Sequence, residues 1–170
     1  MQYKLKHLPV MRFVLFVLLM MSLRSHANDS TKLYNPYANV DKDMQVVLAK
    51  AKAEHKNVMI QIGGNWCVSC YRFNSFLLLD FTLKQLLNDN YVVYHLNYSD
   101  ENKNLNYLKK LGNPHRYGFP VLVVMDSKGN RLYTEPCGLL GKGNGYDTDK
   151  VKQFLIKWST SSLEASYYQQ

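Results

Sequence analysis

The feature of this sequence that most constrains its fold is a pair of cysteines, Cys67 and Cys70, that directly follows a short apolar segment and a glycine pair. A disulfide at this spacing closes a very small loop, so its loop-closure contribution to stability lies at the low end. The value of the pair is therefore chemical rather than structural. The fold has to be one in which an apolar strand leads through a turn into these cysteines.

The segments on either side of the pair predict a strand and then a helix. Residues 58–62 are an apolar run that reads as a strand, and Gly63 and Gly64 break it and let the backbone turn. After Cys67 there is no Gly or Pro until Gly112, and the next dozen residues carry one apolar face. This pattern predicts a helix of about three turns that starts at the cysteines.

A cysteine pair at a helix start has a specific chemistry. The helix N-terminus offers unpaired backbone N–H groups and about half a positive charge, which stabilise a thiolate. We expect Cys67 to cap the helix, to face solvent and to act as the nucleophile with a lowered pKa. We expect Cys70, one turn inside, to attack the mixed disulfide and release the substrate.

Two metal-binding interpretations fit the sequence less well. Half of a zinc site would need two more Cys or His ligands, but there is no second Cys-x-x-Cys motif and the five histidines are scattered. A copper-delivery protein would want a Met or His beside the pair, and none is adjacent. We therefore expect no metal site, and no cofactor other than a redox-active Cys67–Cys70 disulfide.

The rest of the chain predicts an alternation of helices and strands. Helices are expected at residues 41–55, capped by Asp41 or Asp43, 82–88, capped by Thr82, 105–112 and 149–159. Strands are expected at 91–98, 121–125 and 131–134, with loops at 99–104 and 138–145 and a hairpin turn at 126–130. The order β-α-β-α-β-β-α after an opening helix predicts an α/β fold with a central mixed sheet flanked by helices.

The first 27 residues do not belong to this domain. Basic residues such as Lys4 and Arg12 precede an apolar run at 13–21 that is too short to span a bilayer, and Ser25-His26-Ala27 has small residues where a signal peptidase cuts. We expect a signal peptide cleaved after Ala27. An uncleaved anchor is the alternative, and a lipoprotein is not expected because no Cys follows the cleavage site.

Composition then sets the domain organisation and excludes one class of partner. With 46% hydrophobic and 20% charged residues the chain is typical of one globular domain. We assign residues 28–40 to an irregular lead-in, 41–160 to the domain and 161–170 to a tail. Cleavage would remove four of the 21 basic residues and none of the 13 acidic ones, which lowers the net charge from +8 to +4. Without a dense basic cluster, we expect no nucleic-acid partner.

The motifs around the cysteines carry a family resemblance. The segment from Val58 that ends Gly64-Asn-Trp-Cys-Val-Ser-Cys70, together with Tyr117-Gly-Phe-Pro-Val-Leu-Val-Val124, resembles the thioredoxin superfamily. The similarity covers about residues 40–158 and is greatest to the exported branch that includes the periplasmic C-terminal domain of the disulfide reductant conductor DsbD. It implies a thioredoxin-like fold in which the Trp-Cys-x-x-Cys loop faces a cis-proline loop.

The resemblance assigns roles to the residues beside the cysteines. Pro120 falls at the position of the cis-proline, after Phe119, and Trp66 at that of the tryptophan beside the nucleophile. These three residues would shape the groove where a substrate chain lies against Cys67. From the sequence alone, a strand-start proline in trans is the favoured interpretation of Pro120.

Departures from the family pattern concern proton transfer and redox direction. Thioredoxins commonly bury an acidic residue that relays the proton of the resolving thiol. The resemblance places Gln61 at this relay position, and glutamine can form hydrogen bonds but cannot titrate. His95 lies near the position where related proteins carry a lysine close to the buried proton route. It is therefore either a proton relay or an ordinary strand histidine. Val68-Ser69 between the cysteines and Phe119 before the proline leave the direction open, although the DsbD-like motif favours reduction.

Cys137 is the third and unpaired cysteine of the chain. It is either a buried, inert small hydrophobe or the source of a regulatory or intermolecular disulfide. Sequence does not decide between these interpretations.

The function predicted from the sequence is an exported, periplasmic thiol-disulfide oxidoreductase that reduces protein disulfides. Cys67 would attack a substrate disulfide, Cys70 would resolve it, and a membrane thiol reductant would recharge the protein, which we expect to be a monomer. The alternative is a redox-inactive binding module that keeps its cysteines locked as a disulfide and holds a partner in the cis-proline groove.

Overall fold

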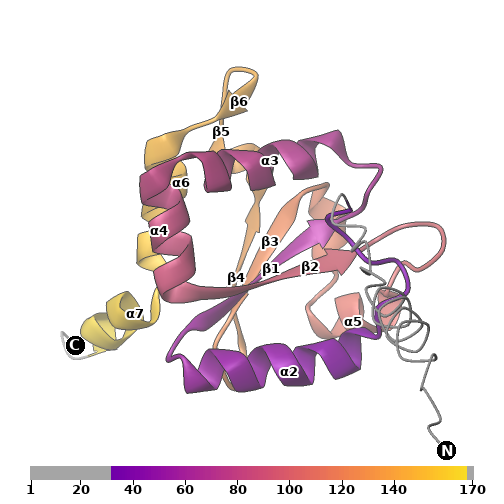
Figure 1. Ribbon diagram of the computed structural model, residues 1–170, viewed down its shortest axis with the longest axis horizontal. Helices are drawn as coiled ribbons and strands as arrows, with labels where there is room; N and C mark the ends of the chain where they lie inside the picture. The colour runs from indigo at the N-terminus through magenta and orange to yellow at the C-terminus, as the bar shows by residue number, and fades with distance from the viewer. Residues whose placement is uncertain (1–31, 168–170) are drawn as a thin grey trace, which may run out of the picture. The chain divides into compact units, whose positions relative to one another are not determined.

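The computed structural model describes residues 32–167 and shows a mixed sheet between two layers of helices (Figure 1). The helices are α2 (Val40–Ala53), α3 (Val68–Leu79), α4 (Phe81–Asn90), α5 (Leu105–Lys110), α6 (Thr148–Lys157) and α7 (Thr160–Tyr167). The strands are β1 (Asn57–Gly63), β2 (Tyr91–Asn97), β3 (Val121–Met125), β4 (Arg131–Pro136), β5 (Gly141–Lys142) and β6 (Gly145–Tyr146). Two 3₁₀ turns, η1 (Pro114–Tyr117) and η2 (Cys137–Leu140), complete the elements.

The main sheet has the strand order β2-β1-β3-β4. β1 pairs with β2 in parallel, while β3 is antiparallel to both β1 and β4. Every residue of β1 and β3 is buried, as expected for central strands that are covered by helices on both faces. The predicted α/β fold with a central mixed sheet is confirmed.

Alternate residues of β1 divide the interior into two cores. Val58, Ile60 and Ile62 pack with α2 and α5, whereas Met59 packs with α3, α4 and α6. Gln61 follows Met59 by two positions, so it points into the second layer, beneath α3. The strand thus brings a buried amide to the layer that carries the cysteines.

Two helix starts differ from the prediction, and both differences place the cap before the predicted residue. Asn39 caps α2 by accepting a hydrogen bond from Lys42 N (3.1 Å), so the capping role predicted for Asp41 or Asp43 is wrong. Asp80 caps α4 by accepting from Leu83 N (3.0 Å), so the cap predicted at Thr82 is also wrong. The two aspartates of α2 lie in its first turn, where their negative charges interact favourably with the positive end of the helix dipole.

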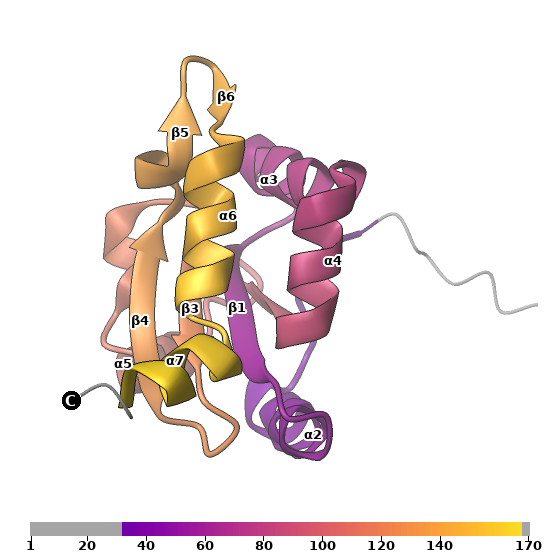
Figure 2. The same cartoon turned by 90° about the vertical axis from the view of Figure 1, so that its left-hand side faces the viewer.

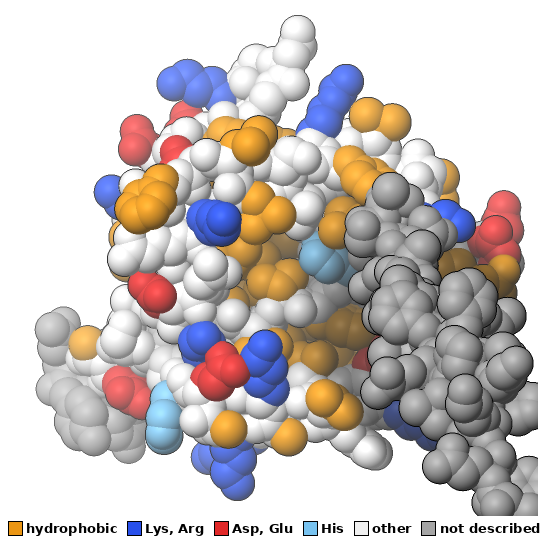
Figure 3. All heavy atoms as spheres, in the orientation of Figure 1, with side chains coloured by type: hydrophobic (Ala, Val, Ile, Leu, Met, Phe, Trp, Pro, Cys, Tyr) orange, Lys and Arg blue, Asp and Glu red, His pale blue; other side chains and the backbone are white. Residues whose placement is uncertain are grey.

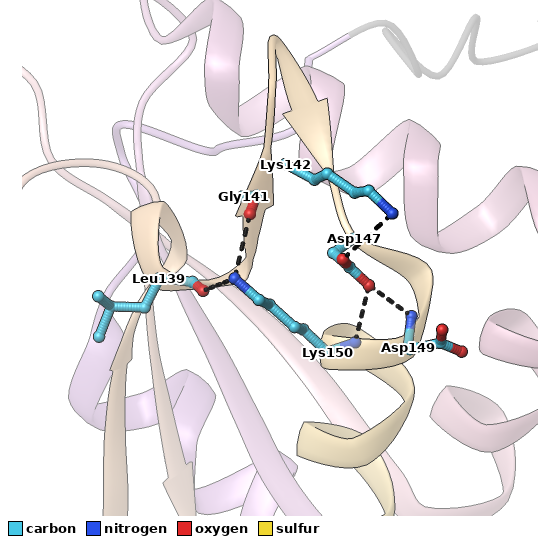
Figure 4. A network of polar contacts seen from close by, with 6 residues as sticks. All are labelled: Leu139, Gly141, Lys142, Asp147, Asp149 and Lys150. Carbon is cyan, nitrogen blue, oxygen red and sulfur yellow. Dashed lines mark hydrogen bonds and ion pairs between the residues drawn. The ribbon is translucent and has the colours of Figure 1, made fainter.

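The segment predicted as a loop at 138–145 contains η2 and the β5–β6 hairpin, which projects past the end of β4 (Figure 2). Figure 4 shows how its base is held. Lys150 Nζ donates to the carbonyls of Leu139 and Gly141 (both 3.3 Å), and Asp147 caps α6 while it pairs with Lys142 (3.7 Å). The tail predicted from residue 161 continues the fold as helix α7.

The predicted signal peptide, residues 1–27, lies outside the described residues. Of the helices described between residues 32 and 167, none has the length and apolar character needed to cross a membrane. On the face shown in Figure 3, Lys and Arg side chains are interspersed with Asp and Glu.

The assignment of Asp80 rather than Thr82 as the N-cap of α4 can be tested by mutation. Replacing Asp80 with Ala should lower the free energy of unfolding by about 1 kcal/mol, because the N–H of Leu83 loses its acceptor. Thr82→Ala is the matched control and should change it by less than about 0.5 kcal/mol. Urea denaturation of both variants measures the difference, and equal effects would contradict the assignment of the cap.

Candidate active site

The cysteine pair lies at the start of α3 and forms a disulfide between Cys67 and Cys70, with Cα atoms 5.3 Å apart. Cys67 is the N-cap residue, and its Sγ accepts a hydrogen bond from Cys70 N (3.2 Å). The predicted capping role of Cys67 is therefore confirmed. Its predicted exposure is wrong, because Cys67 is only 5% exposed and Cys70 is fully buried.

Two glycines allow the backbone before the cysteines to pass close to other groups. A methyl group at Gly63 would collide with Cys70 Sγ and would lie 2.7 Å from Tyr34 Oη. A methyl group at Gly64 would collide with the Trp66 ring and would lie 2.7 Å from the Tyr98 carbonyl. Real Cβ atoms almost never approach other atoms this closely, so both positions require glycine.

Trp66, Phe119 and Pro120 meet beside the disulfide, as the resemblance implies. Trp66 is half exposed, its Nε1 donates to Tyr98 O (2.7 Å), and its ring meets Phe119 edge to face at 5.3 Å. The Phe119–Pro120 peptide bond is cis, and Phe119 packs against the buried cluster of Tyr34, Cys67 and Cys70. These residues form one apolar wall next to the disulfide.

A groove of about 300 Å³ runs from this wall to the β5–β6 hairpin. Its lining includes Phe119 and Pro120 on one side, Ser69 and Arg72 of α3, and Tyr146 of the hairpin. Tyr146 Oη donates to Ser69 O (3.2 Å), which ties the hairpin to the helix that carries the cysteines. Because Ser69 lies between the two cysteines in the sequence, a polypeptide chain lying in this groove would pass close to the start of α3.

Gln61 lies directly under the cysteine helix and is 1% exposed. Its Nε2 donates to Cys70 O (3.1 Å) and to Tyr34 Oη (2.8 Å), so both amide protons are used. Its Oε1 is buried and has no hydrogen-bond partner among the described residues. The position predicted for a proton relay therefore holds a side chain that anchors the helix and a tyrosine.

Tyr34 is the site residue that the sequence analysis missed. It belongs to the segment assigned as an irregular lead-in, yet it is 1% exposed and packs with both cysteines. Asn65 holds it in place, since Tyr34 N donates to Asn65 Oδ1 (3.0 Å) and Asn65 Nδ2 donates back to Tyr34 O (2.8 Å). Tyr71 of α3 donates to the same Asn65 oxygen (2.8 Å) and accepts from Leu33 N (3.1 Å).

His95 lies opposite Gln61 in the parallel β1–β2 register and meets the Tyr34 ring edge to face at 5.6 Å. Its Nε2 is buried without a hydrogen-bond partner among the described residues. Burial lowers the pKa of His95 to about 4, which keeps the imidazole neutral at neutral pH. The structure thus places His95 next to Tyr34, on the strand that neighbours the strand of Gln61.

Cys137 follows β4 directly, and its backbone N–H donates to Pro120 O (3.2 Å). It is 2% exposed and forms no disulfide within the described part of the chain. Burial raises the pKa of its thiol, which keeps it protonated. These properties are those of a buried, inert thiol, one of the two interpretations left open by the sequence.

The positive end of the α3 helix dipole is part of the electrostatic setting of the pair. The first turn of α3 carries no acidic residue, so nothing there opposes the positive end of the helix dipole. Between residues 32 and 167, no group of three or more His, Cys, Asp or Glu side chains is arranged to hold a metal ion. The chemistry that the described site supports directly is thiol-disulfide exchange.

Comparisons with known proteins agree with this geometry. Residues 38–127 match the family model described as thioredoxin-like. A solved structure, the disulphide isomerase from Xylella fastidiosa Temecula1, is 25% identical, covers 74% of this chain and 95% of its own, and has a TM-score of 0.63. The oxidised DsbD C-terminal domain of Neisseria meningitidis is 16% identical over 72% of this chain and 97% of its own, with a TM-score of 0.46. No curated protein matches the sequence.

The close approach at Gly63 yields a prediction about packing. Gly63→Ala should lower the free energy of unfolding by about 2 kcal/mol or more, because its methyl group would displace Cys70 and Tyr34. Gly145→Ala is the control, since a methyl group there meets no atom within 4 Å. Thermal unfolding of the two oxidised variants compares them, and equal midpoints would contradict this packing.

The buried His95 yields a prediction about pH. Its pKa is about 4 in the folded protein and about 6.5 when unfolded, so the unfolded state binds the extra proton between these values. This contribution to stability is complete above about pH 6.5 and is lost as pH falls toward 4, by about 3 kcal/mol in all. Urea denaturation between pH 4 and pH 7 should show the loss in the wild type and a smaller one in His95→Gln. Parallel curves for the two proteins would show that His95 is not responsible.

Proposed function

The chain belongs to the thioredoxin-like family, and from this membership we propose that it is an exported thiol-disulfide oxidoreductase that reduces disulfides in other proteins. The observation that carries the proposal is the Cys67–Cys70 disulfide at the N-terminus of α3, where the backbone N–H of Cys70 points at the Cys67 sulfur. A thiolate on Cys67 would accept that hydrogen bond and be stabilised by the helix dipole.

The proposed reaction begins with the reduced protein. The Cys67 thiolate attacks one sulfur of a substrate disulfide, forms a mixed disulfide and releases the first substrate thiolate, which takes up a proton. Cys70 then loses its proton and attacks Cys67 Sγ, which re-forms the internal disulfide and releases the second substrate thiolate. Two electrons pass to the substrate, and an external dithiol returns them for the next cycle. The exchange needs no metal, flavin or nucleotide, and we propose that no cofactor takes part.

The groove beside the disulfide supports a polypeptide substrate. Its lining includes Phe119 and Pro120 on one side and the hairpin on the other, and Phe119 also meets the ring of Trp66, the residue before Cys67. A protein chain laid along this groove would bring its own disulfide to the cysteine that lies nearer the surface. Because Cys67 is nearly buried, the substrate chain or a small movement of the wall has to expose its sulfur.

The N-terminal segment supports export, and the proposed reductant role requires a source of electrons that reduces the protein again. Basic residues followed by a short apolar run and Ser25-His26-Ala27 support secretion, and we propose the periplasm as the destination. A protein that works there as a reductant needs a source of electrons, which we propose is a membrane thiol protein. We also propose that the protein acts as a monomer.

A second function, a redox-inactive binding module, is favoured by one observation. The disulfide is shielded from solvent, with Cys67 5% exposed and Cys70 fully buried. A disulfide that stays closed would leave the cis-proline groove as a site that holds a partner without turnover. The two functions differ in whether the pair is reversibly reduced.

The reduction potential of the Cys67–Cys70 couple distinguishes these functions. We expect a reversible two-electron couple near the thioredoxin value of about −270 mV when the purified protein is equilibrated with dithiothreitol. Cys67→Ser should abolish reduction of insulin disulfides, and Cys137→Ala is the matched cysteine control that should retain it.

A potential nearer to about −120 mV would make the protein an oxidant instead. If no reversible couple is found, the enzyme proposal fails and the binding module takes its place.

A further inference from the structure

Among the described residues, the buried polar groups around Cys70 leave one hydroxyl proton, that of Tyr34, without an assigned acceptor. Gln61 uses both of its amide protons, one on Cys70 O and one on Tyr34 Oη. Tyr34 Oη therefore accepts a hydrogen bond from Gln61, and its own O–H proton remains to be donated. A buried hydroxyl of this kind is costly unless it finds an acceptor.

The acceptor that the geometry offers is the sulfur of Cys70. Tyr34 Oη and Cys70 Sγ both lie within 2.7 Å of the point where a Gly63 methyl group would sit, and Gly63 leaves that point empty. Tyr34 and the two cysteines also form one packed cluster. A disulfide sulfur is a weak acceptor, but a thiolate is a strong one, so a hydrogen bond from Tyr34 becomes favourable when Cys70 ionises.

We infer that Tyr34 is a catalytic residue that donates its O–H hydrogen bond to the Cys70 thiolate during resolution of the mixed disulfide. This inference rests on the proposed function, because it concerns the second step of that exchange. The hydrogen bond would stabilise the Cys70 thiolate after the Cys70 thiol has lost its proton to water, and the thiolate would then displace the substrate thiolate from Cys67. No covalent bond to Tyr34 forms or breaks.

Two features suit Tyr34 to this role. Burial raises the pKa of its phenol, so the group stays protonated and remains a donor. The described titratable groups that lie nearest to it, besides the cysteine pair, are Tyr71 of α3, His95 of β2, Tyr146 of β6 and Cys137 after β4. None of these is a carboxylate, so no nearby negative charge competes for the hydroxyl proton.

The segment before α2 fixes the position of the phenol. The paired hydrogen bonds between Tyr34 and Asn65 connect this segment to the residue next to Trp66, and the Leu33–Tyr71 bond connects it to the first turns of α3. Both attachment points flank the cysteines. The segment before α2 is thus a structural part of the site and holds Tyr34 against the cysteine pair.

The test measures resolution alone, on the full chain purified as the cell processes it. The reduced protein is mixed with the chromogenic disulfide of thionitrobenzoate, which forms a mixed disulfide on Cys67, and release of the second thionitrobenzoate reports attack by Cys70. Tyr34→Phe should slow this release about tenfold at pH 7 and raise the midpoint of its pH profile by about one unit, as expected for loss of a hydrogen bond to a charged group.

Tyr91→Phe is the matched control. Like Tyr34, Tyr91 is a buried tyrosine. Its hydroxyl donates to the Leu155 carbonyl (2.8 Å), and its ring packs in the core formed with α3, α4 and α6, not in the cluster that contains the cysteines. Its loss should affect folding stability much as the loss of the Tyr34 hydroxyl does and leave release of thionitrobenzoate unchanged. Equal release rates and pH profiles in Tyr34→Phe and the wild type would overturn the inference.

A second measurement applies if Tyr34→Phe does not fold. Wild-type protein labelled with ¹³C at the tyrosine Cζ atoms, with Cys67 alkylated, should show one tyrosine signal that titrates with the midpoint of Cys70. That signal is assigned to Tyr34 in the wild type by the contacts of its ring with the His95 ring. Absence of any such signal would also overturn the inference. Failure of the wild type to reduce insulin would count against the proposed function instead, since release of thionitrobenzoate does not depend on a protein substrate.

Discussion

The site depends on the missing side chain of Gly63, because Cys70 Sγ and Tyr34 Oη both occupy the space that a side chain there would need. Any side chain at this position would push the resolving sulfur away from β1 and lift the first turn of α3. Because Cys67 caps that turn with its sulfur, the geometry of the disulfide, the helix start and the strand end are set together. Gln61, two residues earlier on β1, then fixes the helix from below through Cys70 O.

Local sequence patterns predicted the elements that carry this arrangement. The apolar run at Val121–Met125 gave the bounds of β3, and the cysteine spacing placed Cys67 at the cap of α3 because a helix start has one characteristic set of donors. The helix start at α4 was misplaced, since Asp80 and Thr82 are both good capping residues and only the backbone decides between them. The burial of Cys67 could not be predicted, because it lies in a cluster with Tyr34 and Cys70 that is covered by Phe119, far along the chain.

Contacts between distant segments explain what the sequence analysis missed. Tyr34 lies in a segment without helical or strand periodicity, and its partners Asn65 and Gln61 lie about 30 positions away, so no local pattern marks it. The β5–β6 hairpin was predicted as a loop because its strands have two residues each and include two glycines. Both segments are irregular by composition and are ordered by the α3 layer against which they lie.

The buried surroundings of Cys70 have a consequence for how its charge is handled. A carboxylate at the Gln61 position would accept the thiol proton but would also repel the thiolate once it forms. Gln61, Tyr34 and neutral His95 reverse this balance, because none of them carries a negative charge at neutral pH and Tyr34 has a proton to donate. Such a site stabilises the Cys70 thiolate but offers no carboxylate among the described residues to take the thiol proton, so that proton would leave to water before the attack. The Cys70 thiolate then displaces the substrate thiolate from Cys67, and the hydrogen bond from Tyr34 would set the fraction of Cys70 that is ionised and able to do so.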